Sequence, residues 1–135
     1  MNKAKVKCRD IQFFSKKNNQ MVCVHSKEER EYARMLEEDP EIVFYETGKE
    51  LDRSRYSFVN PIGIRKSYFD TEWATDFVLH YEDGRIGVRE LVSASALEKQ
   101  AAIEKLEFSR RYWANSEASE WKVLIMEKGD RENVL

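Results

Sequence analysis

Two acidic residues, Asp76 and Glu90, lie in what the sequence predicts to be a β-hairpin. The stretch from Thr75 to Val92, TDFVLHYEDGRIGVRELV, contains two apolar-rich segments joined by a turn signal at Asp83-Gly84. Asp76 comes early in the first segment and Glu90 late in the second. Carboxylates in strands that are otherwise apolar are candidate ligands for a divalent cation.

The length of the turn decides whether these two carboxylates meet, because side chains alternate between the two faces of a strand. With a two-residue loop, Asp83-Gly84, the Asp76 and Glu90 side chains would point to opposite faces. A three-residue loop that begins at Glu82 puts Gly84 in the left-handed conformation as a bulge. Asp76 would then lie directly opposite Glu90, with Cβ atoms about 5 Å apart. A metal site therefore requires the three-residue loop.

Two carboxylates that close, on a face built otherwise from valine and isoleucine, would repel each other. A divalent cation removes that repulsion, and hard oxygen ligands suit Mg²⁺ or Mn²⁺, which keeps bound waters and binds phosphate oxygens. Such an ion can activate water for attack on a phosphodiester. The alternative is structural: Asp76 caps a neighbouring turn, and Glu90 pairs with an arginine.

A third carboxylate, Glu29, lies at the start of a predicted helix. Ser26 and Glu29 have the spacing of a capping box, and Asp39-Pro40 ends the helix. Glu29 shares a helical stripe with Ala33 and Leu36, so we expect it to lean toward the interior. Its carboxylate can cap the helix and reach a metal at the same time.

The remaining segments predict the framework that must position these residues. We expect one α/β domain over residues 1–135, with residues 1–9 loosely held and helices flanking a mixed central sheet. The predicted elements are a hairpin at 11–14 and 21–24, a helix at 26–39, short strands at 42–45 and 56–59, an exposed excursion at 60–74, the acidic hairpin at 75–92, a helix at 96–116, and a strand buried on both faces at 121–126.

Composition excludes several classes of protein. Of the 135 residues, 41% are hydrophobic and 36% charged, as in a soluble domain with a real core. No apolar run approaches the roughly 18 residues that cross a bilayer, and no secretory signal is present, so we expect a cytoplasmic protein without membrane contact. Cys8 and Cys23 match no paired-cysteine zinc spacing, and we expect reduced thiols.

The net charge of −2 at pH 7 provides no global attraction to nucleic acid, but basic residues are clustered along the chain. A cluster in the middle of the chain could contact DNA phosphates; its members are Arg53, Arg55, Arg65 and Lys66. The alternatives are a solvated face or a docking patch for a protein partner.

Taken together, these segments resemble the nuclease domain of the TnsA-type endonuclease subunit of heteromeric transposases. SKEEREYARMLEEDPEIVFYE resembles the family's N-terminal helix, where a catalytic glutamate precedes an L-E-x-D-P-x-V-like run. The hairpin resembles the family core, in which a P-D-F strand and a D-G turn lead into an E-V-K strand, and WKVLIME is similar to the strand that ends the domain. The resemblance covers about residues 26–127, and the matching residues are Glu29, Leu36, Glu37, Asp39, Pro40, Val43, Asp76, Phe77, Asp83, Gly84 and Glu90.

This resemblance implies a restriction-endonuclease-like fold of the PD-(D/E)xK group and Mg²⁺-dependent cleavage of DNA at transposon ends. Carried over to this chain, Glu29, Asp76 and Glu90 would be the site carboxylates, with the Leu91 carbonyl as a further ligand of the Mg²⁺ or Mn²⁺ ion. The implied partners are DNA and a transposase subunit or another protein of a mobile element.

One departure concerns the family lysine two residues after the glutamate, which is Val92 here. Residues two apart share a face of a strand, so such a lysine can reach the same phosphate as Glu90, whereas valine cannot. We expect Lys99, in the first turns of the following helix, to replace it, ahead of Lys105 and Arg89. The alternatives are a catalytically lapsed nuclease fold acting as a DNA-binding or assembly subunit, and a small interaction protein whose carboxylates are only structural.

Overall fold

The structure is a computed structural model, and it describes residues 11–126. The predicted α/β class is confirmed. The elements, with 3₁₀ helices labelled η, are β1 (Ile11–Ser15), β2 (Gln20–Val24), α1 (Lys27–Glu38), β3 (Ile42–Glu50), η2 (Arg53–Phe58), η3 (Lys66–Asp70), β4 (Ala74–Tyr81), β5 (Ile86–Ser93), η4 (Ala96–Glu98), α2 (Gln100–Ala114) and β6 (Glu120–Met126). Among these, no helix has the length and apolar character needed to cross a bilayer.

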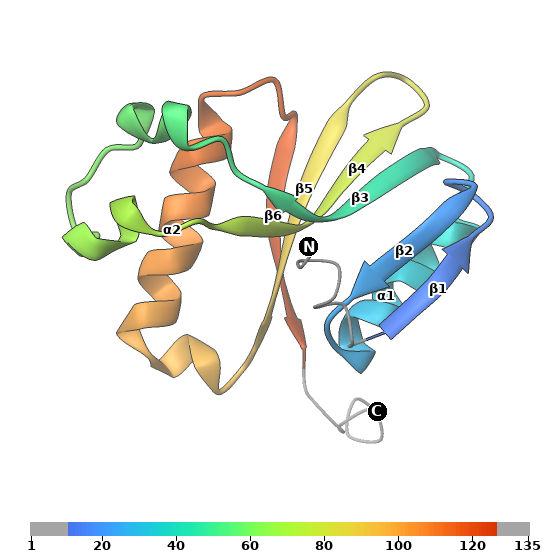
Figure 1. Cartoon of the computed structure of the whole chain (residues 1–135), viewed down its shortest axis with the longest axis horizontal. Helices are drawn as coiled ribbons and strands as arrows, with labels where there is room; N and C mark the ends of the chain where they lie inside the picture. Colours follow the sequence, from blue (N-terminus) through green and yellow to red (C-terminus); the bar gives the residue numbers. More distant parts are fainter. Residues whose placement is uncertain (1–10, 127–135) are drawn as a thin grey trace, which may run out of the picture.

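A mixed sheet of four strands forms the centre, in the order β3-β4-β5-β6. The first three strands pair antiparallel, and β6 runs parallel to β5. A parallel pair needs a crossover, which α2 provides. In Figure 1, α2 and the 3₁₀ helices η2 and η3 lie on one side of the sheet, and α1 with the β1–β2 hairpin lies on the other. The acidic hairpin thus supplies the two middle strands.

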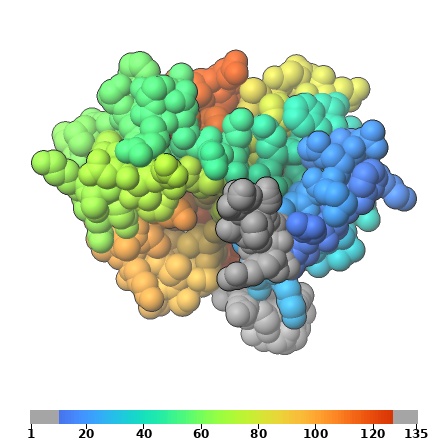
Figure 2. All heavy atoms as spheres, in the orientation of Figure 1, coloured from blue at the N-terminus to red at the C-terminus, as the bar shows by residue number. Residues whose placement is uncertain are grey.

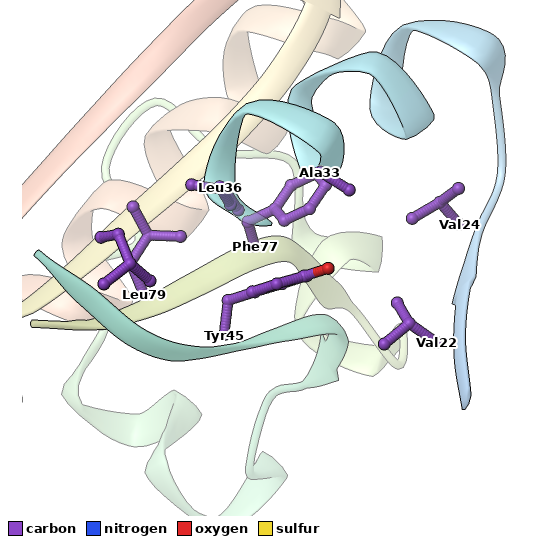
Figure 3. Close-up of a cluster of buried hydrophobic side chains, with 8 residues drawn as sticks. Val22, Val24, Ala33, Leu36, Tyr45, Phe77 and Leu79 are labelled. Carbon is purple, nitrogen blue, oxygen red and sulfur yellow. The ribbon is translucent and has the colours of Figure 1, made fainter. Parts of the chain in front are cut away.

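Helix α1 begins and packs as its sequence predicts. The Glu29 N–H donates to the Ser26 hydroxyl at 3.0 Å, and the helix buries Ala33 and Leu36. Phe77 of β4 is fully buried and points toward Ala33 in Figure 3. The cluster on this face of the sheet comprises Val22, Val24, Ala33, Leu36, Ile42, Tyr45, Phe77 and Leu79.

A second cluster, between α2 and the 3₁₀ helices, corrects two predictions. The strand expected at 56–59 is wrong, because Asp52 accepts the Ser54 N–H at 2.9 Å and starts the 3₁₀ helix η2 there. The segment 60–74 is not wholly an exposed excursion, since Ile64 is only 8% exposed. The buried members are Leu51, Tyr56, Val59, Ile64, Phe108 and Tyr112.

Three further predictions differ from the structure, and they concern the last strand, the second long helix and one cysteine. The final strand β6 lies at the edge of the sheet, and Ile125 is 54% exposed, so the prediction of burial on both faces is wrong. The helix expected at 96–116 is broken into η4 and α2 at Lys99. Cys23 is disulfide-bonded rather than a reduced thiol. Cys8 and the N-terminal segment 1–9 lie outside the described residues, which begin at residue 11.

The turn between β4 and β5 confirms the three-residue loop. The Tyr81 N–H donates to the Arg85 carbonyl at 3.0 Å, the Gly84 N–H donates to the Tyr81 carbonyl at 3.0 Å, and Gly84 has a φ of +94°. The strands pair Phe77 with Arg89. This register continues to Asp76 opposite Glu90.

Replacing Gly84 by alanine should lower the free energy of unfolding by about 1 kcal/mol, because its left-handed backbone strains an L-residue. An added Cβ would meet nothing within 4 Å, so the cost comes from the backbone rather than from a collision. Urea unfolding measures the change. Gly84→Asn should recover part of the loss, since asparagine tolerates this region better. An alanine variant as stable as the wild type would contradict the strained turn.

Candidate functional site

Asp76 and Glu90 meet where strands β4 and β5 stop pairing through their backbones. The last backbone pair is Phe77 with Arg89. Beyond this pair, each carboxylate accepts a backbone N–H in place of a carbonyl. The Asp76 N–H donates to Glu90 Oε1 at 3.3 Å, and the Leu91 N–H donates to Asp76 Oδ2 at 2.8 Å. We call Asp76 and Glu90 the acidic pair. The three-residue turn thus brings together two of the expected site residues.

Glu90 is only 5% exposed, and side chains from β4 and α2 hold it in place. Its Oε2 accepts from the Thr75 hydroxyl at 3.0 Å and from the Ser109 hydroxyl at 2.6 Å. Two indoles support these hydroxyls: Trp113 Nε1 donates to Thr75 Oγ1 at 2.8 Å, and Trp121 Nε1 donates to Ser109 Oγ at 2.9 Å. Sequence reasoning missed these four residues. The signal that could have found two of them is the helical spacing that Ser109 and Trp113 share within the helix predicted at 96–116.

The surroundings raise the pKa of both carboxyls. Burial is the main cause for Glu90, and repulsion from Asp76 adds to it, so that the pKa of Glu90 rises to about 7. Burial also raises the pKa of Asp76, against the opposing effects of the Leu91 N–H and then of the Lys105 and His25 charges. Near neutral pH the acidic pair therefore tends to retain a proton, which a bound cation would displace.

The donor chemistry of the acidic pair fits a hard divalent cation. A carboxylate offers about four lone-pair sites, and the hydrogen bonds to Glu90 occupy three of them. Asp76 is half-buried and accepts the Leu91 N–H through Oδ2. One oxygen from each residue with several waters is a coordination that Mg²⁺ accepts. Leu91 contacts the acidic pair through its N–H, whereas the resemblance implied its carbonyl.

Glu29 does not complete a three-carboxylate centre. Its Oε1 accepts the His25 N–H at 2.8 Å, and it lines a separate cavity of about 190 Å³ with Leu91 and Val92. Within residues 11–126, no group of three or more histidine, cysteine, aspartate or glutamate residues is placed to hold a metal ion. The geometry therefore supports a site of two carboxylates, with Glu29 in the neighbouring cavity.

Lys105, rather than Lys99, is the lysine whose charge acts on the acidic pair. Lys99 is exposed at the N-cap of α2 and makes no capping hydrogen bond there through its side chain. The charge of Lys105 lowers the pKa of Asp76. Arg89 faces the opposite side of the sheet, where it donates to the Tyr81 hydroxyl at 3.0 Å and to Glu120 at 3.3 Å.

The four basic residues expected to contact DNA lie in or beside η2 and η3, whose green surface adjoins that of α2 in Figure 2. Arg65 is already engaged, since its Nε donates to Glu104 at 2.9 Å. The guanidinium of Arg55 lies 5.8 Å from the centroid of the Phe58 ring. Arg53 and Lys66 are exposed. This surface therefore offers fewer uncompensated charges than the sequence suggested.

No model of a known protein family matches this sequence, and a search of proteins with curated functions found no match. The likeness to TnsA-type nucleases therefore depends on the residues quoted above.

Proposed function

We propose that this protein is an endonuclease-like subunit related to the TnsA type, which binds Mg²⁺ or Mn²⁺ at the acidic pair and cleaves DNA phosphodiesters with a transposase partner. The observation that carries the proposal is the register of β4 and β5, which forces Asp76 and Glu90 together at the point where the two strands part. Two convergent carboxylates with raised pKa values are typical of functional sites.

The fold supports the same proposal. The acidic hairpin forms the two middle strands of the mixed sheet, and helices cover both faces. A restriction-endonuclease-like domain of the PD-(D/E)xK group would carry its acidic residues on such a hairpin. This arrangement places the acidic pair on rigid elements, which favours precise positioning of a ligand.

The residues around the acidic pair would each have a separate task. Asp76 and Glu90 would hold the ion, which would supply a Lewis acid for a phosphate oxygen and an activated water. Thr75 and Ser109 fix the orientation of Glu90 through its Oε2. The indoles of Trp113 and Trp121 fix these hydroxyls in turn, so the carboxylate cannot swing away from the site.

The test is to incubate the purified protein with supercoiled, branched and transposon-end DNA in the presence of Mg²⁺ or Mn²⁺, with and without a transposase partner. We expect metal-dependent nicking, and binding of Mn²⁺ measurable by calorimetry. A protein that neither binds Mn²⁺ nor cuts any of these substrates would contradict the proposal.

A second candidate function is that of a lapsed nuclease which binds DNA or assembles with a partner. Val92 in place of the family lysine favours it, as do the hydrogen bonds that the Thr75 and Ser109 hydroxyls donate to Glu90 Oε2. Binding of DNA or of a transposase that survives Asp76→Ala, with no cleavage by the wild type, would select this alternative.

A further inference from the structure

We propose that the segment 58–64, which runs from the end of η2 toward η3, enters a groove of duplex DNA and separates two stacked bases. We call this segment the wedge loop. The inference rests on the proposed function for the class of ligand, because DNA is the substrate there. The task of the wedge loop would be to hold and deform the duplex, not to take part in cleavage.

Two large apolar side chains project from the wedge loop. Ile62 is 75% exposed, and Phe58 is 61% exposed. Helix α2 holds the backbone beneath both of them. Asn115 Nδ2 donates to the Phe58 carbonyl at 3.1 Å. Arg111 Nη1 donates to the Ile62 carbonyl at 2.8 Å. Because positions 111 and 115 are one helical turn apart, the two exposed side chains belong to one surface.

The tip of the wedge loop is fixed by its own hydrogen bonds and by the core. The Ile62 N–H donates to Asn60 Oδ1 at 2.9 Å, and Gly63 takes the left-handed conformation with a φ of +83°. Val59 on one side of the tip and Ile64 on the other are buried in the second cluster. A tip that is already ordered loses little conformational entropy when it meets a ligand. In Figure 1 the loop is the green segment at the left edge of the molecule.

Basic residues flank this apolar tip in the sequence. Residues 52–66 contain four basic residues and one acidic residue, a net charge of +3 on a chain whose net charge is −2. Arg53 and Arg55 precede the wedge loop, and Arg65 and Lys66 follow it. The tip therefore lies between two positively charged ends.

Helix α2 holds these two ends apart. Arg55 Nη2 donates to the Asn115 carbonyl, and Arg65 Nε donates to Glu104 Oε1. The positions on α2 that hold them are eleven residues apart, or about 16 Å along the helix axis. An apolar tip with positive groups on both sides matches a groove of DNA, where stacked bases lie between two rows of phosphates. Proteins that kink DNA insert isoleucine or phenylalanine between bases in this way.

Two other classes of partner fit this surface less well. A protein partner would need an apolar pocket with carboxylates on both sides of it, whereas duplex DNA presents negative charge on both sides of its bases at every step. An anionic membrane would attract the basic residues, but the strength of membrane binding increases with the apolar area that is buried. Two side chains, Phe58 and Ile62, provide little such area.

The test measures binding to a short duplex that carries 2-aminopurine, a base whose fluorescence rises when it is unstacked, beside a flexible TA step. Chelator is present, so no metal-dependent cleavage interferes. We expect the wild type to raise the fluorescence. Ile62→Ser should bind about 10-fold more weakly and should not raise it, whereas Ile62→Leu should do both as the wild type does. Met35→Ser is the matched control, because Met35 is 62% exposed on α1, at the other side of the sheet.

A second pair of variants tests the flanking charges. Lys66 is exposed at the start of η3. Lys66→Gln should weaken binding and reduce the slope of log affinity against log salt concentration by about 1, since one phosphate contact is lost. Its fluorescence rise at saturation should stay as in the wild type. Arg34→Gln, which removes an exposed charge from α1, should change neither quantity.

Several results would overturn the inference. Ile62→Ser that binds and unstacks DNA as the wild type does is one, and an equal loss in Ile62→Leu or in Met35→Ser is another. A wild type that binds phosphatidylserine vesicles and no duplex would assign the wedge loop to a membrane instead. A salt slope that Lys66→Gln leaves unchanged would remove the flanking contact. None of these measurements involves metal, so they are distinct from a failure of the proposed function, in which the wild type neither binds Mn²⁺ nor cuts.

Discussion

Replacement of Asp76 by asparagine is expected to abolish Mn²⁺ binding and to slow DNA cleavage by at least about 100-fold, while the protein stays folded. The substitution removes one of the two negative charges that would hold the ion. Asparagine has nearly the same shape, and its carbonyl oxygen can still accept the Leu91 N–H that Asp76 accepts at 2.8 Å. The loss of activity should therefore come from charge and not from a change in the hairpin.

Calorimetry with Mn²⁺, a cleavage assay and thermal unfolding together measure the effects of Asp76→Asn. Asp70→Asn, at an exposed position in η3, is the matched control and should change none of the three. Undiminished cleavage by Asp76→Asn would show that any nuclease activity in the preparation comes from another site or another protein. A wild type without Mn²⁺ affinity would instead favour the lapsed nuclease.

Replacement of Glu90 by glutamine is expected to stabilise the protein by about 1–3 kcal/mol at about pH 8. In the wild type the pKa of Glu90 is raised from 4.5 to about 7. The folded state thus binds this proton more tightly than the unfolded state does. The associated stability is fully present below about pH 4.5 and is lost as the pH rises through about 7. Glutamine is neutral throughout and avoids that loss.

Urea unfolding of the wild type and of Glu90→Gln at several pH values between about 5 and 8 measures this effect. The informative quantity is the difference between the free energies of unfolding of the two proteins. Glu104 and Glu107 do not contribute to its pH dependence, because their pKa values are lowered to about 2 and their charge does not change in this range. The difference should grow with pH. Glu38→Gln, at an exposed position in α1, should give a curve parallel to that of the wild type. Parallel curves for Glu90→Gln would contradict the raised pKa of Glu90.

These two predictions describe one physical conflict. The fold brings two like charges together in a buried place, which costs stability at neutral pH, and such costs are common where a site binds a charged ligand. Glu90→Gln should therefore be more stable than the wild type at about pH 8 and less active. A variant that gained stability without losing Mn²⁺ affinity would show that Glu90 is a structural residue only.

Local interactions made several features predictable from sequence. The Asp83-Gly84 turn depends on the positive φ that Gly84 accepts, and this turn alone sets the register that pairs Asp76 with Glu90. The start of α1 depends on the Ser26 hydroxyl and an N–H three residues away. Such contacts involve residues a few positions apart, so their energies can be read from the chain itself.

Only the tertiary structure decided which distant groups reach the acidic pair. The helical stripe of Glu29 led us to expect it near a metal at the acidic pair, but the placement of α1 on the sheet puts it in another cavity. The placement of α2 brings Lys105 and Ser109 to the site and leaves Lys99 at its exposed start. Periodicity specifies the face of a helix that is buried, whereas the position of that helix along the sheet comes from the packing of Phe108 and Tyr112 against segments far away in sequence.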